Sequence, residues 1–254
     1  MRFHVLAVPH TITNKEYVAC AFTQKVLKFC DMMTNRGHTT IHYGHEDSNV
    51  NCSEHVTVIT RDIYNKVYGD YDWHVKNFKF DLQDEAYRTY NENTIAAIKK
   101  RQQPHDFVLA FWGQGNKAIC DAVPGMYVVE PGIGYSQAFA NYRIYETYAL
   151  MHCNLGLDRV QYSGNMPWYH CVIPNYFDVN DFEFSDQKSD YFLYLGRITT
   201  AKGVDLIIDI TGNIGAKLII AGQGEPSDIG RTEWPSNVEY VGCLLYTSPS
   251  PRDS

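Results

Sequence analysis

Residues 190–225, DYFLYLGRITTAKGVDLIIDITGNIGAKLIIAGQGE, constrain the fold of this chain more than any other stretch. An apolar strand is predicted over Tyr191–Leu195, a short helical pattern follows Gly203, and a second apolar strand is predicted over Leu218–Ala221. Strand, helix, strand is the βαβ unit, whose two strands are parallel. The sequence therefore predicts an α/β fold in this part of the chain.

Two basic residues follow the first of these strands. Arg197 comes directly after Gly196, and Lys202 lies five residues further along, before Gly203. Open α/β sheets bind ligands at the carboxyl ends of their strands, and Arg and Lys neutralise phosphate oxygens. A helix that starts at Val204 would also direct N–H groups at an anion. The segment predicts a site for a phosphorylated ligand; the alternative is an ordinary basic surface loop.

Three motifs in chain order resemble the retaining glycosyltransferases that have the two-domain GT-B fold, of the family 4 or group 1 type. Residues 190–225 resemble the start of that family's nucleotide-sugar domain. VIPNYFD at Val172–Asp178 resembles its VIPN-x-x-D segment, and NRGHTTIHYG at Asn35–Gly44 resembles the turn after its first helix. The resemblance implies that a hexosyl-type sugar passes from a nucleotide-diphosphate sugar to an acceptor, with retention of the anomeric configuration.

The resemblance also implies roles for single residues at the second domain. Arg197, Lys202 and Gly196 would bind the donor diphosphate. The two cations would stabilise the leaving group without a metal. Gly222 and Gly224, which follow the second strand, would lie near the nucleotide, although a simple turn explains them equally well. No cofactor is implied, because the nucleotide sugar is a substrate.

The N-terminal half offers weaker candidates. His10 and Thr11 lie in the first loop, Pro9–Asn14, at the place where many relatives carry a glycine-rich loop facing the donor phosphate. This loop contains no glycine, so direct backbone contact with the phosphate is not implied. Glu130 ends a strand near the sugar site of relatives and is a weak catalytic candidate. A carboxylate that caps the following turn is an equal alternative.

Two further polar groups suggest other chemistry. His42, His45 and Glu46 stand close in sequence, but their spacing matches no closed metal site, so we expect no metal. Arg143 and Glu146 lie three residues apart on a helix predicted over residues 138–152 and are expected to pair with each other.

The chain is predicted to form two domains. Residues 1–180 have the alternating strand and helix pattern of a Rossmann-like, acceptor-side domain, within which residues 62–82 are not assigned. Residues 181–189 are polar and acidic and are predicted to be a linker. Residues 190–242 are predicted to begin a second Rossmann-like domain, which binds the donor.

The last twelve residues, CLLYTSPSPRDS at 243–254, follow no periodic pattern. They are expected to be disordered. One choice of codons for them resembles a transposase-type library adapter, so we expect a non-native tail and a natural reading frame cut after Gly242. The E-x7-E segment of the family's donor domain is not found beyond that residue. We therefore expect this chain to be an inactive fragment of its parent enzyme.

Composition limits the partners. A net charge of −7 and a pI of about 5.8 argue against a general nucleic-acid surface. The chain has seven scattered cysteines without a CxxC pair, and it opens on a predicted strand where a signal peptide would stand. Both features favour the cytoplasm. It has no apolar run of membrane-spanning length, so we expect no transmembrane segment. The acceptor, whether glycan, lipid or small molecule, is not specified. A nucleotide-sugar epimerase of GT-B fold and a non-catalytic binding protein stay open as alternatives.

Overall fold

The computed structural model describes residues 1–73, 78–162, 167–181 and 184–242. The chain divides into two compact units, Met1–Asp178 and Val179–Ser254. The predicted tail, residues 243–254, lies outside the described residues. Within the described ranges, no helix is long and apolar enough to cross a membrane, and the six cysteines found there are unpaired thiols.

The larger unit is built on a seven-stranded parallel sheet, in the order β3-β2-β1-β4-β5-β6-β7. Its strands are β1 (Arg2–Leu6), β2 (Thr39–His45), β3 (Glu54–Ile59), β4 (Phe107–Ala110), β5 (Tyr127–Ile133), β6 (Tyr142–Tyr145) and β7 (Cys171–Val172). Its helices are α1 (Ala21–Asn35), α2 (Arg61–Tyr68), α3 (Glu85–Lys99), α4 (Lys117–Asp121) and α5 (Tyr148–Tyr162), with a 3₁₀ turn η1 (Gly113–Asn116). This order, which reverses direction at β1, is that of a doubly wound Rossmann-like sheet.

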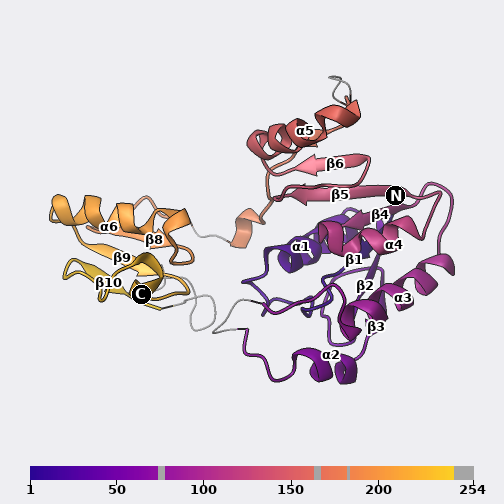
Figure 1. Ribbon diagram of the computed structural model, residues 1–254, viewed down its shortest axis with the longest axis horizontal. Helices are drawn as coiled ribbons and strands as arrows, with labels where there is room; N and C mark the ends of the chain where they lie inside the picture. Colours follow the sequence, from indigo (N-terminus) through magenta and orange to yellow (C-terminus); the bar gives the residue numbers. More distant parts are fainter. Residues whose placement is uncertain (74–77, 163–166, 182–183, 243–254) are drawn as a thin grey trace. The chain divides into compact units, whose positions relative to one another are not determined.

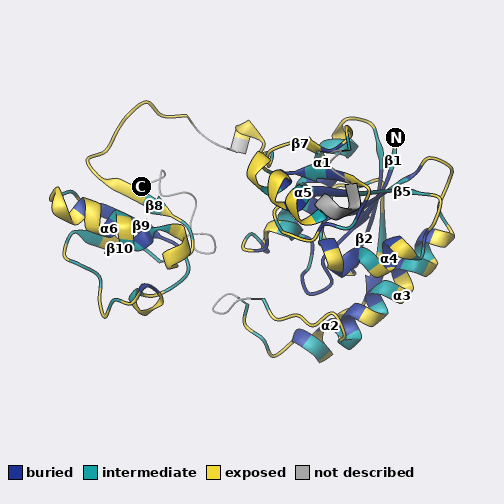
Figure 2. Ribbon diagram, turned by 45° about the horizontal axis from the view of Figure 1, so that its top comes forward, coloured by how far each residue is buried: buried dark blue, intermediate teal, exposed yellow. Residues whose placement is uncertain are grey.

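Helices cover both faces of this sheet, as Figure 1 shows. Residues of β1 alternate between the faces: Leu6 packs with α2, α3 and α4, whereas Phe3 and Val5 pack with α1. The strands are apolar on both sides because both faces are covered. Figure 2 shows the buried residues along the strands and on the inner sides of the helices.

The helix predicted over residues 138–152 is wrong. The chain instead forms β6, and α5 begins only at Tyr148. Tyr145 of β6 is fully buried and Met151 of α5 packs in the same cluster. The tertiary context therefore overrode the helical pattern, because a parallel sheet offers β6 a partner on each side. The unassigned stretch after residue 61 contains α2.

The smaller unit confirms the predicted βαβ arrangement. Its strands are β8 (Phe192–Leu195), β9 (Leu218–Ala221) and β10 (Val238–Tyr240), in the parallel order β10-β9-β8. Helix α6 (Val204–Asn213) connects β8 to β9. The described residues of this unit also form the 3₁₀ turns η2 (Val179–Asp181), η3 (Thr200–Lys202) and η4 (Pro226–Ile229). The core of this unit consists of Ile198, Val204, Ile208, Leu218, Ile220 and Ile229.

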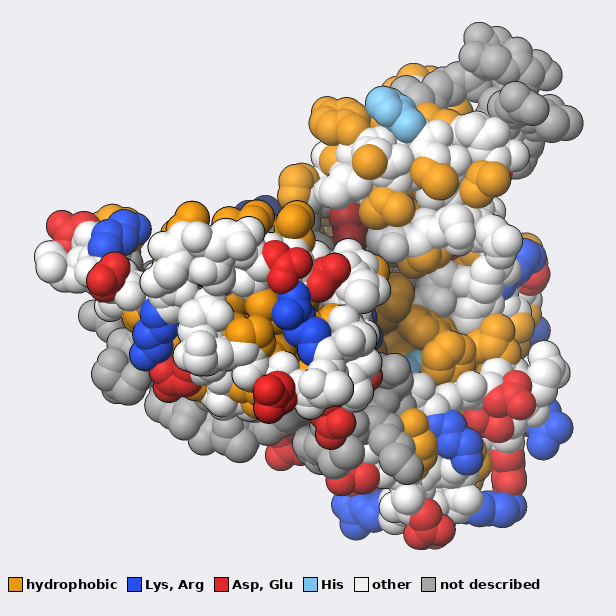
Figure 3. Space-filling model, turned by 60° about the vertical axis from the view of Figure 1, so that its left-hand side comes forward, with side chains coloured by type: hydrophobic (Ala, Val, Ile, Leu, Met, Phe, Trp, Pro, Cys, Tyr) orange, Lys and Arg blue, Asp and Glu red, His pale blue; other side chains and the backbone are white. Residues whose placement is uncertain are grey.

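One face of the smaller sheet carries exposed apolar side chains in the described part of the chain. Leu193 and Leu195 of β8 are 45% and 65% exposed, and they alternate with Tyr194, which packs into the core. Figure 3 shows hydrophobic side chains open at the surface of both units, among scattered acidic and basic groups.

Buried histidines in the larger unit make its stability depend on pH. His42 of β2 is fully buried, and its Nδ1 lies 2.9 Å from Nδ1 of His55. Burial, and secondarily the neighbouring His55, lower the pKa of His42 to about 3. In the unfolded chain, this histidine takes up a proton near pH 6.5. The stability that the neutral, buried His42 contributes is therefore fully present above that pH and is lost as the pH falls toward 3.

We predict that the free energy of unfolding of the larger unit declines between pH 6.5 and pH 4. The contribution of His42 is up to about 1.4 kcal/mol per pH unit. Urea titrations followed by circular dichroism at several pH values measure the slope. His42→Gln should reduce this slope by the equivalent of up to one proton taken up on unfolding. Equal slopes of unfolding free energy against pH for the variant and the unchanged protein would contradict the assignment.

Candidate functional site

The candidate phosphate site lies at the carboxyl edge of the smaller sheet. Gly196 and Arg197 directly follow β8, and Gly222 directly follows β9. Because β8 and β9 are parallel, these residues meet at the same edge. Lys202 ends the 3₁₀ turn η3, and Gly203 then turns the chain into α6 with a φ of +70°. Gly203 suits this position because the left-handed region strains residues that carry a Cβ.

Gly196 and Gly222 bring two backbone segments into direct contact. A Cβ built on Gly222 would stand 1.8 Å from the carbonyl oxygen of Gly196, so position 222 has no room for a side chain. The pairing continues beyond the strands: the Gly196 N–H donates to Ala221 O, and the Ile198 N–H donates to the carbonyl of Gln223, both at 2.9 Å. This contact fixes the loop that carries Arg197.

The second glycine turn is held in a similar way. The Tyr240 hydroxyl donates to the carbonyl of Gly222 at 2.9 Å and to that of Gly224 at 3.1 Å. A Cβ on Gly224 would stand 2.8 Å from the Cβ of Ile198. Gly222 and Gly224 therefore form a turn that needs glycine because it lies against the loop after β8.

The basic side chains at this edge are available to a ligand. Arg197 and Lys202 are exposed. Within the described part of the chain, neither side chain takes part in a hydrogen bond or an ion pair. By contrast, Arg231 pairs with Asp209, and Lys217 pairs with Glu239 at 2.7 Å. The carboxyl edge thus presents two unpartnered cations at the start of a ten-residue helix.

A hollow of about 370 Å³ lies at the opposite edge of the same sheet, lined by Gly215–Lys217 and Ser236–Glu239. Lys217 is engaged by Glu239 there. Since the hollow lies before β9 and β10 and its cation is neutralised, it does not belong to the phosphate site. It supplies a matched control position for the experiments on Arg197 and Lys202.

His10 and Thr11 lie inside the larger unit, at the carboxyl end of β1. His10 is 4% exposed, and its Nδ1 lies 2.8 Å from the hydroxyl of Tyr87. Burial lowers the pKa of His10 to about 3, so the ring is neutral near pH 7. The Thr11 hydroxyl lies 2.6 Å from that of Thr23. In this structure both side chains are engaged by neighbours of the loop.

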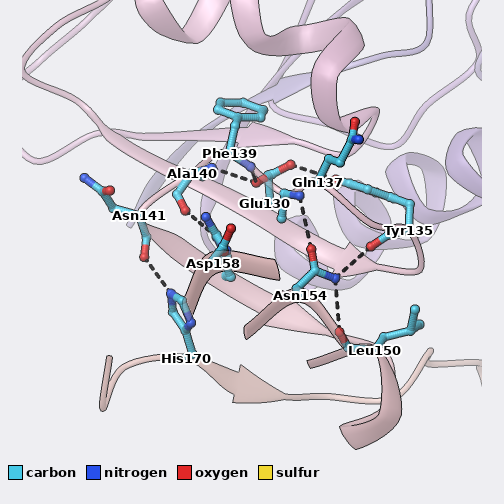
Figure 4. Close-up of polar contacts among 12 residues, drawn as sticks. Glu130, Tyr135, Gln137, Phe139, Ala140, Asn141, Leu150, Asn154, Asp158 and His170 are labelled. Carbon is cyan, nitrogen blue, oxygen red and sulfur yellow. Dashed lines mark hydrogen bonds and ion pairs between the residues drawn. The ribbon is translucent and has the colours of Figure 1, made fainter. Parts of the chain in front are cut away.

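Glu130 is buried at the centre of a polar network that Figure 4 shows. One carboxylate oxygen accepts hydrogen bonds from the backbone N–H groups of Phe139 and Ala140, both at 2.7 Å. The other accepts from the Tyr135 hydroxyl at 2.9 Å. Burial raises the pKa of Glu130, and these donors, led by the Ala140 N–H, oppose that effect. This is the geometry of a carboxylate that caps the following turn.

The predicted pairing of Arg143 with Glu146 is wrong. Arg143 lies on β6, is 3% exposed, and pairs with Asp158 while donating to the Ala140 carbonyl at 2.7 Å. Glu146 pairs instead with Lys25 of α1. Arg143 lies in β6 and Glu146 directly follows this strand. Successive side chains of a strand point to opposite faces, so residues three apart do not meet as they would on a helix.

Sequence reasoning missed the residues that gather at the carboxyl edge of the larger sheet. Phe22, Lys25, Trp112 and Tyr135 come from separate loops and helix starts, and no shared motif connects them. The available signal was the FWGQGN segment, where two glycines flank one polar residue next to aromatic side chains. Among the described residues, no cluster of three His, Cys, Asp or Glu side chains is arranged to hold a metal ion.

Glu130→Ala should destabilise the larger unit. The substitution leaves two buried N–H groups without an acceptor, at a cost of about 1–3 kcal/mol each. Urea unfolding at pH 7 measures the loss, and Glu92→Ala, at an exposed position on α3, should stay within about 0.5 kcal/mol of the unchanged protein. Equal stability of Glu130→Ala and Glu92→Ala would contradict the capping role.

Gly222→Ala should destabilise the smaller unit by about 1–3 kcal/mol, because the added methyl group would displace the Gly196 carbonyl. Gly212→Ala is the matched control: Gly212 lies in α6, where a Cβ would make only an ordinary contact of 3.8 Å with Oδ1 of Asn237, so alanine should stabilise the helix by about 0.5–1 kcal/mol. Hydrogen exchange of the α6 amides reports both effects. Gly222→Ala with exchange as slow as Gly212→Ala would refute the close contact.

Comparison with solved structures identifies the architecture. AviGT4, a glycosyltransferase involved in avilamycin A biosynthesis, aligns with a TM-score of 0.52 and 14% identity over 95% of this chain, which spans 63% of AviGT4. The α,α-trehalose 6-phosphate synthase of Burkholderia multivorans aligns with a TM-score of 0.53 and 11% identity over 95% of this chain and 72% of that protein.

The N-terminal domain of Candida albicans trehalose-6-phosphate phosphatase gives the same TM-score, 0.53, with 11% identity over 99% of this chain and 73% of that domain. No protein-family profile matches the sequence. No curated protein matches it either. At these identities the likeness concerns the fold, which is α/β with Rossmann-like units of the GT-B type.

Proposed function

We propose that the parent protein of this chain transfers a sugar from a nucleotide-diphosphate sugar to an acceptor. The observation that carries the proposal is the pair of exposed cations, Arg197 and Lys202, at the carboxyl edge of the smaller sheet; among the described residues, neither side chain has a hydrogen-bond or ion-pair partner. Their loop is fixed by the contact between Gly196 and Gly222. In open α/β sheets this edge is the ligand-binding edge. The GT-B fold and the presence of a glycosyltransferase, AviGT4, among its neighbours support the same reaction.

The two cations act on the leaving group. When the bond from the anomeric carbon to the diphosphate breaks, negative charge develops on the diphosphate oxygens. Arg197 would hold these oxygens through its planar fork and Lys202 through its point charge. Because the diphosphate carries more negative charge in the transition state than in the bound donor, the two cations would stabilise the transition state more than the ground state. The N–H groups at the start of α6 add to this field.

We also propose that the transfer retains the anomeric configuration, because residues 190–225 resemble retaining enzymes. The same resemblance suggests the role of each part of the chain: residues 1–180 would form the acceptor side, residues 181–189 the linker, and residues 190–242 part of the donor side. Gly222 and Gly224 would lie beside the nucleotide. His10, Thr11 and Glu130 are buried in the larger unit, and we infer a structural role within that unit for each of them.

The proposal predicts that Arg197 and Lys202 are required for nucleotide binding and turnover. Isothermal titration with UDP, GDP and ADP should find one that binds, and Arg197→Ala or Lys202→Ala should weaken it at least about tenfold. In the parent enzyme, the same substitutions should lower turnover of the matching nucleotide sugar by about 10²–10³. Lys217→Ala, which removes a cation at the opposite edge, should leave both unchanged.

Product analysis separates the alternatives. A nucleotide sugar returned as its epimer, without transfer, would replace the transferase by the epimerase. No turnover of UDP-, GDP- or ADP-sugars, together with unchanged nucleotide binding in Arg197→Ala and Lys202→Ala, would refute the proposed function and leave a non-catalytic binding protein.

A further inference from the structure

An ion pair and several aromatic rings meet at the carboxyl edge of the seven-stranded sheet. Lys25 lies near the start of α1, and Glu146 directly follows β6. The Lys25 ammonium donates to the Gly132 carbonyl at 2.8 Å and pairs with Oε1 of Glu146. The two side chains are 11% and 19% exposed, so the pair is mostly covered but reachable from solvent.

The second oxygen of Glu146 lies open beside a glycine. A Cβ built on Gly134 would stand 2.8 Å from Oε2, so any side chain at that position would cover it. Gly134 is exposed, and within the described residues Oε2 accepts no hydrogen bond. Lys25 therefore fixes the carboxylate while one oxygen stays available to an incoming donor.

Aromatic rings lie next to this carboxylate. The ammonium of Lys25 stands 5.1 Å from the ring centroid of Phe22. Phe22 in turn contacts Trp112 edge-to-face at 4.6 Å and Tyr135 at 6.0 Å. All three rings are half-buried, so each keeps part of its surface in contact with solvent.

The backbone is shaped to receive two of these rings. A Cβ on Gly113 would stand 2.7 Å from the ring of Tyr135, and a Cβ on Gly115 would stand 1.9 Å from Cδ1 of Trp112. The glycines of the FWGQGN segment thus allow the rings to lie directly on the chain. The positions of the Tyr135 and Trp112 rings therefore depend on glycine at positions 113 and 115.

We propose that this edge binds a pyranose ring of a carbohydrate acceptor; the inference rests on the proposed sugar transfer. A pyranose presents C–H faces, which pack on aromatic rings, and hydroxyl donors, which a carboxylate accepts. A lipid acyl chain would cover the Lys25–Glu146 pair without giving it a hydrogen bond, which is costly. A phosphate is disfavoured because Glu146 already neutralises Lys25.

The test measures glycoside binding to the full chain in the absence of any nucleotide. Saturation-transfer NMR with methyl glycosides of glucose, galactose, mannose and N-acetylglucosamine, and with maltose and cellobiose, should detect at least one ligand. Glu146→Gln and Gly134→Ala should each weaken it about tenfold or more. Trp112→Phe, which keeps an aromatic ring of smaller area, should weaken it less than Trp112→Leu.

Two matched controls lie away from the edge. Trp168, which is 89% exposed and precedes β7, and Glu92 on α3 supply an aromatic and a carboxylate control. Trp168→Ala and Glu92→Gln should bind the glycoside as the unchanged protein does. Circular dichroism spectra that match for all variants confirm that a loss of binding is not a loss of fold.

The outcome separates this inference from the proposed function. No glycoside binding, with nucleotide binding to Arg197 and Lys202 intact, would overturn the carbohydrate acceptor alone. Binding of phosphatidylglycerol vesicles that Glu146→Gln does not weaken would also overturn it, in favour of a lipid. Glycoside binding that the variants weaken, together with nucleotide binding, supports the inference; the same glycoside binding without any nucleotide binding would support a carbohydrate site but overturn its role as an acceptor site.

Discussion

The contact between Gly196 and Gly222 is the constraint on which the candidate donor site depends. Parallel strands place the ends of β8 and β9 at one edge, but only the absence of a side chain at Gly222 lets the following backbone segments touch. The loop from Arg197 to Lys202 is thereby anchored at its start, and Gly203 anchors its end by turning into α6. Under the proposed function, the anchored loop would hold its cations where phosphate charge develops, and such preorganisation is a source of electrostatic catalysis.

In the larger unit, buried polar side chains hold the turn that follows β5. Glu130 gives the turn after β5 the acceptors that its N–H groups need, and Arg143 ties the same turn to α5 through Asp158. Because these groups are satisfied by one another, they can be buried without a large cost. These bonds fix the turn beside the carboxyl edge, where the mostly covered Lys25–Glu146 pair and the half-buried aromatic rings form the proposed carbohydrate site.

The sequence was most informative where function and local structure coincide. The βαβ unit around Arg197 was predictable because apolar strands, glycine turns and a helix follow in fixed order within residues 190–225. The strand β6 was not predictable, since its pattern is short and only its neighbours in the sheet decide its conformation. The Lys25–Glu146 pair joins residues 121 positions apart, so no local pattern could reveal it.

The proposed function requires that the carboxyl edge of the smaller sheet binds a nucleoside diphosphate. Hydrogen exchange with and without saturating UDP, GDP or ADP measures this directly, amide by amide. We predict slower exchange at residues 196–204 and 222–225 with the nucleotide that binds, and no change at the opposite edge, residues 215–217. Protection confined to residues 215–217 and 236–239, or none in the smaller unit with any of the three nucleotides, would contradict it.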